Sequence, residues 1–171
     1  RNPLQNESIS FIQSQKNSIR YPKKDRINRL KGSGMKKLII IPAYNEAENI
    51  ERVVKSLEQT GNKDYIIIND GSTDDTAQIC AEKGYPCISL GVNLGLMGAF
   101  QTGLWYAYDN GYDYVLQFDG DGQHQPEYIA GMVSLAMKEQ ADIVIGSRFL
   151  TKKKGFGARM LGSRLLTTLV F

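Results

Sequence analysis

The stretch KKLIIIPAYNEAENIERVV, residues 36–54, decides the fold class of this chain. Its apolar run KLIII, residues 37–41, is short and continuous, which is typical of a strand buried on both faces. Asn45 and Glu48 follow with the spacing of a helix capping box, and apolar residues then recur at helical spacing over 50–57. A buried strand that leads directly into an amphipathic helix predicts an α/β protein.

The same alternation continues along the chain. Further buried strands are predicted at four places: 64–68, 87–90, 112–118 and 142–146. Helices are predicted between them: after a cap at Ser72 or Thr73, over 99–110, and from Pro126 onward. This order predicts a Rossmann-like, mostly parallel sheet with helices on both faces. In such sheets, ligands bind outside the carboxyl ends of the strands.

Composition and charge exclude several classes of protein. The net charge is only +3, and residues 35–147 carry seven Lys and Arg against sixteen Asp and Glu, which disfavours a general nucleic-acid binder. Cys80 and Cys87 match no zinc or redox motif, so we expect buried or free thiols. We find no secretory signal pattern and no run of the roughly 18 apolar residues that a membrane span needs.

Two ends of the chain differ from its body. Residues 1–34 lack sustained periodicity and end in GSG, so we expect a flexible extension, a tag or a fusion segment, with a native basic arm as the alternative. Residues 148–171 carry six basic side chains and no acid. We expect 35–171 to be one domain that is incomplete at its C-terminus.

Acidic side chains follow three of the predicted strands. Glu46 follows the first strand, Asp70 the second, and the pair Asp119 and Asp121 the fourth. An Asp-x-Asp pair at a strand end offers two hard oxygen ligands, and Gln123 adds a neutral oxygen. Mg²⁺ that is held by one or two carboxylates usually completes its shell with water and phosphates. The pattern therefore predicts a divalent cation and a nucleoside diphosphate.

Turns, a calcium loop and a phosphatase motif are the alternative interpretations of these motifs. NDGST and DGDG could each be simple turns. A calcium loop fails because His124 and Ala130 stand where Gly and Glu are needed, and Gln123 fits a phosphatase motif poorly. We expect His124 to be a hydrogen-bonding or packing neighbour, and Trp105 and Tyr106 to lie in the core. The absence of G-x-G-x-x-G after the first strand and of G-K-[ST] disfavours a dinucleotide oxidoreductase and excludes a P-loop.

Five motifs in this order resemble the family 2 glycosyltransferases of GT-A fold. They are IPAYNE at 41–46, NDGSTDDT at 69–76, NLG with QTG at 93–103, QFDGDGQHQPEYI at 117–129 and GSRF at 146–149. The resemblance covers about residues 36–165 and is nearest to the branch of dolichyl-phosphate mannosyltransferase and bacterial polyprenyl-phosphate glycosyltransferases. It implies a metal-dependent inverting enzyme that moves a sugar from a UDP- or GDP-linked donor to a polyprenyl or dolichyl phosphate or a cell-surface glycan. It also implies Mg²⁺ or Mn²⁺ as cofactor and the cytoplasmic face of a membrane as location.

The resemblance also implies roles for particular residues. The residues implied to bind the nucleotide-sugar are Pro42, Tyr44, Glu46, Ile68, Asp70, Asp119, Gly120, Asp121 and Arg148. The implied metal ligands are Asp119, Asp121 and Gln123, and the implied catalytic residues are Asp121 and Arg148. Arg159 or Arg164 is implied to bind the acceptor phosphate, and 148–171 either contact a membrane surface or form a solvated loop followed by a core helix.

Two alternatives belong to other classes. A truncated or fused domain would bind nucleotide without turnover. A nucleotidyltransferase would be expected to carry a Gly-rich basic loop after the first strand, and PAYNEAEN is neither Gly-rich nor basic. A lipid-phosphate acceptor needs little or no general base, whereas a sugar hydroxyl would need a carboxylate that the sequence does not identify.

Overall fold

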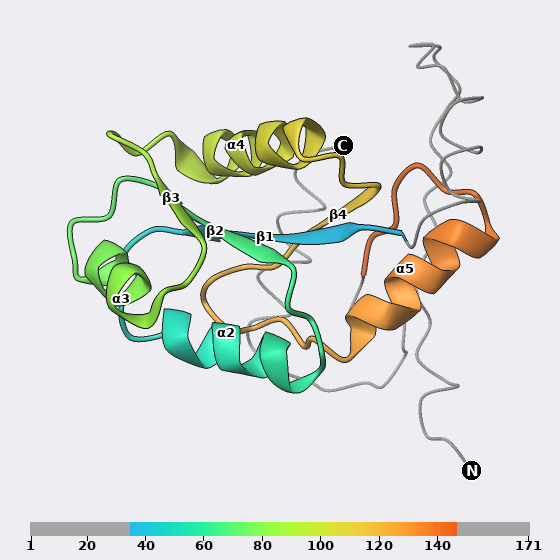
Figure 1. The fold of residues 1–171 in the computed structure, drawn as a ribbon, viewed down its shortest axis with the longest axis horizontal. Helices are drawn as coiled ribbons and strands as arrows, with labels where there is room; N and C mark the ends of the chain where they lie inside the picture. The colour runs from blue at the N-terminus through green and yellow to red at the C-terminus, as the bar shows by residue number, and fades with distance from the viewer. Residues whose placement is uncertain (1–34, 147–171) are drawn as a thin grey trace, which may run out of the picture.

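Four parallel strands form one sheet with the order β3-β2-β1-β4 (Figure 1). The structure is a computed structural model that describes residues 35–146. The strands are β1 (Lys37–Ala43), β2 (Tyr65–Asn69), β3 (Cys87–Ser89) and β4 (Tyr114–Gln117). The predicted parallel sheet is confirmed, because each of these strands lies within a predicted apolar run or extends at most two residues beyond it.

The strand order creates a switch point beside β1. β1 pairs with β2 from Ile39 opposite Tyr65 onward, and on its other side with β4 from Lys37 opposite Tyr114 onward. The chain therefore builds outward from β1 through β2 to β3, and then crosses to the far side of β1 for β4. In open α/β sheets, the crevice at the carboxyl ends beside such a reversal is the usual ligand site.

Helices cover both faces of this sheet. They are α2 (Ile50–Gln59), α3 (Thr76–Lys83), α4 (Gly95–Asp109) and α5 (Tyr128–Lys138). Figure 1 shows α4 alone on one face and α2, α3 and α5 on the other. Alternate residues of β1 point to opposite faces, so that Ile39 and Ile41 pack with α2 while Leu38 and Ile40 pack with α4. The predicted fold class is confirmed.

Two predicted helix caps are wrong. Asn45 does not cap a helix; it has a left-handed φ of 56° in the loop after β1, and α2 begins five residues later. Ser72 and Thr73 do not cap α3 either, since this helix begins at Thr76. The side chains of Asn45 and Ser72 instead accept hydrogen bonds from main-chain N–H groups of each other's loops, so they do not cap the helices.

The fifth predicted strand is also wrong. Within residues 35–146, the stretch 142–146 forms no strand, and Ile143 and Ile145 are 60% and 46% exposed. An apolar run becomes a strand only where a neighbour accepts its backbone hydrogen bonds, and no described strand pairs with this one. The helix predicted from Pro126 begins at Tyr128, a shift within the usual uncertainty of helix ends.

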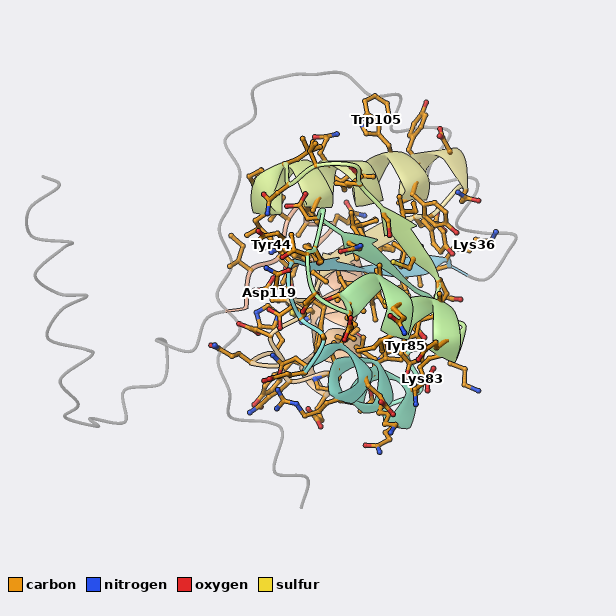
Figure 2. The ribbon with its side chains drawn as sticks, turned by 90° about the vertical axis from the view of Figure 1, so that its left-hand side faces the viewer. Lys36, Tyr44, Lys83, Tyr85, Trp105 and Asp119 are labelled. Carbon is orange, nitrogen blue, oxygen red and sulfur yellow. The ribbon has the colours of Figure 1, made fainter. Side chains whose placement is uncertain are left out.

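The outer face of α4 carries an aromatic side chain that was predicted to be buried. Trp105 is 62% exposed and projects away from the sheet in Figure 2, whereas Tyr106 packs against the core as predicted. The buried residues of α4 are Ala99, Gly103 and Ala107. An added Cβ at Gly103 would lie 2.4 Å from Cγ2 of Ile40. Close helix-to-sheet packing thus leaves no room for the indole.

Several predictions fall on residues that the structure does not describe. They concern the extension 1–34 and the basic residues Arg148, Arg159 and Arg164. Within residues 35–146, no helix is both long enough and apolar enough to cross a membrane. Cys80 is buried, Cys87 is half-buried, and neither forms a disulfide, as expected for free thiols.

Candidate functional site

The loops that follow the strands meet at the carboxyl edge of the sheet. Figure 2 shows Tyr44, from the loop after β1, and Asp119, from the loop after β4, together on the left, at a height between α4 and α2 and opposite Lys36, which directly precedes β1. The two loops are in direct contact, since an added Cβ at Gly120 would lie 3.0 Å from the carbonyl oxygen of Pro42. The predicted convergence of these motifs is therefore present for the four described strands.

Asn45 fastens the loop after β1 to the loop after β2. Its main-chain N–H donates to Oγ of Ser72 at 3.0 Å, and its side-chain oxygen accepts the N–H of Thr73 at 2.8 Å. Asparagine tolerates the left-handed conformation better than most residues, and its short amide reaches the neighbouring main chain. Asn45 is thus a structural link between the two loops. The sequence did not predict this role, because Asn45 also matches a helix-capping pattern.

A second link between the same loops is centred on Thr76. This side chain is fully buried; its Oγ1 accepts the N–H of Glu46 at 2.9 Å and donates to Oδ1 of Asp74 at 2.5 Å. The other oxygen of Asp74 accepts the N–H of Ala47 at 3.0 Å. Partial burial acts to raise the pKa of Asp74, but the hydrogen bonds from Thr76 and Ala47 outweigh it and hold the pKa below its usual value. Asp74 is therefore a carboxylate committed to loop structure.

Asp70 lies nearly buried beneath the loop after β3. It is 3% exposed, and its Oδ1 accepts the N–H of Leu94 at 2.7 Å. Beside it, Gly71 has a φ of +66°, and an added Cβ would lie 2.7 Å from the main chain of Val92 and Asn93. The loops after β2 and β3 therefore approach so closely that only glycine fits at position 71.

Ile68 is placed differently from the other predicted site residues. It is fully buried in β2, between Pro42 of β1 and Ile88 of β3 in the strand register. Its side chain belongs to the core on the α4 face. Only its main chain could serve a bound nucleotide.

The Asp-x-Asp loop follows β4 at the switch point. Asp119 and Asp121 are half-buried, Gly120 is buried, and Gly122 has a φ of +74° that glycine adopts without strain. Oδ1 of Asp121 accepts the N–H of Gln123 at 2.9 Å, while the Gln123 side chain is exposed. The second aspartate is therefore oriented by a local turn.

Two neighbours engage the carboxylate of Asp119. Gln117 donates to its Oδ1 at 2.9 Å, and Nε2 of His124 lies 3.2 Å from its Oδ2. Nδ1 of His124 accepts the N–H of Asp119 at 3.4 Å, and the imidazole packs edge-on against Phe118 with ring centroids 5.4 Å apart. His124 is thus the hydrogen-bonding neighbour that the sequence predicted.

The residues of this loop fit a magnesium- or manganese-type cation. Within residues 35–146, no group of three or more His, Cys, Asp or Glu side chains is placed to hold a metal by itself. Asp119 and Asp121 are nevertheless two half-buried carboxylates on one loop at the carboxyl edge of the sheet. Mg²⁺ rarely has an all-protein cage and takes one or two carboxylates together with substrate phosphates, so a two-carboxylate loop suits it.

Sequence reasoning missed the contribution of α2 to this site. Arg52 donates from Nη2 to the carbonyl oxygen of Asp121, and it lines a recess of about 480 Å³ between α2 and residues 122–127. No motif marks Arg52, because its contact is to main chain 69 residues away. A solvated arginine on a helix gives no signal in a single sequence.

A parallel α/β sheet with acidic loops at its switch point defines a class of proteins that bind nucleotides at the strand ends. Residues 38–168 match the family described as Glycosyl transferase family 2, and the chain belongs to this family. The predicted resemblance is confirmed.

Relatives and solved structures agree with this membership. The chain is 35% identical over 133 residues to a UDP-N-acetylglucosamine–dolichyl-phosphate N-acetylglucosaminyltransferase of Methanococcus voltae, covering 68% of this chain and 53% of that protein. It is 32% identical over 120 residues to an undecaprenyl-phosphate mannosyltransferase of Micrococcus luteus, covering 67% and 49%. A crystal structure of residues 1–349 of TarS from S. aureus has a TM-score of 0.51 at 23% identity, covering 62% and 33%, which shows a shared fold. The chain spans about half the length of the curated relatives it matches.

Proposed function

We propose that this chain carries the donor-binding site of a metal-dependent inverting glycosyltransferase. The observation that carries the proposal is the placement of Asp119 and Asp121 at the switch-point edge, in contact with the loop of Pro42 and Glu46. The donor would be a UDP- or GDP-linked sugar. We propose a polyprenyl or dolichyl phosphate as acceptor, because two relatives are named for transfer to such lipids.

Different loops at the carboxyl edge would bind different parts of the nucleotide-sugar donor. We propose that Pro42, Tyr44 and Glu46 contact the base and ribose, with Asp70 and the main chain of Ile68 beneath them. Tyr44 is 48% exposed at the carboxyl edge of the sheet, which leaves its ring available for a base. Asp119, Asp121 and Gln123 would hold the cation, and Gly120 would let the diphosphate approach the main chain.

The reaction needs charge stabilisation more than proton transfer. A phosphate oxygen of the acceptor forms a bond to the anomeric carbon, the bond from that carbon to the diphosphate oxygen breaks, and the nucleoside diphosphate leaves with the electron pair. A bound cation supplies positive charge to the departing diphosphate. The acceptor phosphate is already an anion near neutral pH, so the described residues need not supply a base. Arg148, outside the described residues, is proposed to add a second positive charge.

Two further parts of the proposal concern residues outside the described range. We propose that 35–171 form one glycosyltransferase domain, with 1–34 as a separate extension. We also propose that the basic segment 148–171 contacts the membrane that holds the lipid acceptor, with Arg159 or Arg164 on the acceptor phosphate.

A transfer assay tests the proposal. The chain is incubated with UDP- and GDP-linked sugars, a polyprenyl phosphate in detergent and Mn²⁺, and the glycolipid is measured by mass spectrometry. We expect product from one nucleotide class, no product from Asp121→Ala, and unchanged product from Asp109→Ala, which removes an exposed carboxylate at the far end of α4. Product formation by Asp121→Ala at the wild-type rate would refute the role of this loop.

A further inference from the structure

Arg52 connects the loop after β1 with the loop after β4 at the carboxyl edge of the sheet. Its Nη2 donates to Oδ1 of Asn49 at 2.7 Å and to the carbonyl oxygen of Asp121 at 3.3 Å. Asn49 in turn donates from Nδ2 to Oε2 of Glu46 at 2.8 Å. A continuous chain of hydrogen bonds therefore runs from Glu46, in the loop after β1, through the first turn of α2 to the main chain of Asp121.

Gly120 and Gly122 of the Asp-x-Asp loop pack closely against Glu46 and Arg52, the first and last side chains of this hydrogen-bonded chain. An added Cβ at Gly122 would lie 2.8 Å from Nη2 of Arg52, and one at Gly120 would lie 3.4 Å from Cγ of Glu46. The Asp121–Gly122 turn is thus packed against the guanidinium on one side and against the first loop on the other. Both ends of the hydrogen-bonded chain touch the segment that presents the two aspartates.

We propose that Arg52 is a positioning residue for the cation and diphosphate, acting through the main chain of Asp121. This inference rests on the proposed function. Two carboxylates bind a cation well only if they are held in the binding geometry beforehand, because ordering a loose turn costs conformational entropy at the moment of binding. The planar guanidinium suits this role, since the two N–H bonds of its Nη2 have fixed directions and serve Asn49 and the Asp121 carbonyl together.

The role requires geometry and not merely positive charge. Lysine at position 52 would keep the charge, but an ammonium on a flexible stem lacks the fixed, planar N–H directions of the guanidinium. Asn49 should matter in the same direction as Arg52, because its side chain holds the guanidinium in place. Asn49 makes no side-chain capping bond to α2, so its replacement does not remove a helix cap.

The experiment compares Arg52→Gln, Arg52→Lys and Asn49→Ala with Lys55→Gln in the 171-residue chain. Lys55 is an exposed residue of the same helix, paired with Glu51, and its replacement removes the same charge. Mn²⁺ affinity is measured by electron paramagnetic resonance without nucleotide, and hydrogen exchange of residues 119–125 is measured without metal. Thermal unfolding checks that each variant folds.

We expect a selective effect at the Asp-x-Asp loop. Arg52→Gln and Arg52→Lys should raise the Kd for Mn²⁺ by about threefold to tenfold, as loss of one exposed charge-assisted hydrogen bond implies. Asn49→Ala should have a smaller effect in the same direction. Exchange over 119–125 should quicken in these variants without metal, and Lys55→Gln should match the wild type in both measurements.

Three results would overturn the inference, and they are distinguishable. Wild-type Mn²⁺ binding that Arg52→Gln leaves unchanged would refute the role of Arg52 alone. A normal Kd in Arg52→Lys beside a raised Kd in Arg52→Gln would mean that charge, not positioning, is responsible. Failure of the wild-type chain to bind Mn²⁺ both without nucleotide and with UDP or GDP present would refute the metal site of the proposed function and the inference with it.

Discussion

Replacing Thr76 with valine should lower the free energy of unfolding by about 2 kcal/mol, although the two side chains have nearly the same shape. Thr76 is fully buried and links the loops after β1 and β2. Valine would leave the N–H of Glu46 without its acceptor and would remove the short bond to the Asp74 carboxylate. A neutral hydrogen bond contributes about 1 kcal/mol and one to a charged group about 1.5 kcal/mol or more, while the added methyl group offsets a part.

The loss can be measured by urea denaturation followed by far-ultraviolet circular dichroism. With a slope of roughly 2 kcal/mol per molar urea, the midpoint should fall by about 1 M. Thr76→Ser keeps the hydroxyl and should lose clearly less. Thr73→Val is the matched control, because Thr73 is exposed and its hydroxyl lies 3.4 Å from Oδ1 of Asn45; it should cost less than about 0.5 kcal/mol. A Thr76→Val midpoint equal to that of the wild type would refute the role of this buried link.

Three further predictions concern other parts of the fold. Asp74→Asn should lower the free energy of unfolding at neutral pH, and the difference from the wild type should disappear as pH falls through the lowered pKa of Asp74. A carboxyl group whose pKa is lowered by folding stabilises the fold above its ordinary pKa, and protonation in acid removes that stabilisation. Equal stabilities of the two proteins at all pH values would contradict this. Gly103→Ala should cost about 1–3 kcal/mol in the same urea assay, and this cost should shrink in an Ile40→Ala background, since the new Cβ would overlap Cγ2, Cγ1 and Cδ1 of Ile40. The hydrogen bond from the Cys80 thiol, followed by those from Ser89 and the main chain, outweighs burial and lowers the pKa of Cys87 to about 7. Alkylation of Cys87 by iodoacetamide, followed by mass spectrometry, should therefore rise with pH through about 7 and outpace that of Cys80, whose pKa is raised.

The sheet could be predicted from the sequence because its strands are continuous apolar runs. Runs such as KLIII at 37–41 have no polar face, which identifies a strand covered on both sides. The run at 142–146 has the same character, yet it forms no strand within the described residues. Pairing depends on a neighbour, and a local pattern carries no information about one.

The errors in α2 and α4 have the same origin. Asn45 matched a capping pattern, but Thr73 of another loop engages its side chain. Trp105 was assigned to the core by its place in the middle of the helix, whereas the buried residues of α4 are small and Gly103 packs closely on Ile40. Tertiary contacts overrode local preference in both cases.

The residues of the candidate site also fall into those that the sequence could predict and those that it could not. The acids at the strand ends could be identified because they follow the strands directly and the topology brings strand ends together. Thr76, Asn49 and Arg52 could not, because they act through hydrogen bonds to loops that the sequence does not place beside them. Groups that hold a site in shape leave a weaker signal than groups that face a ligand.

Calorimetric titration with UDP and with GDP, each in Mn²⁺ and in EDTA, tests the central claim most directly. The claim is that the carboxyl edge around Asp119 and Asp121 binds a nucleoside diphosphate through a divalent cation. We predict that one of the two nucleotides binds in Mn²⁺, that EDTA abolishes the heat, and that Asp121→Ala abolishes it as well. Binding of equal strength in EDTA, or no binding of either nucleotide in Mn²⁺, would contradict the claim.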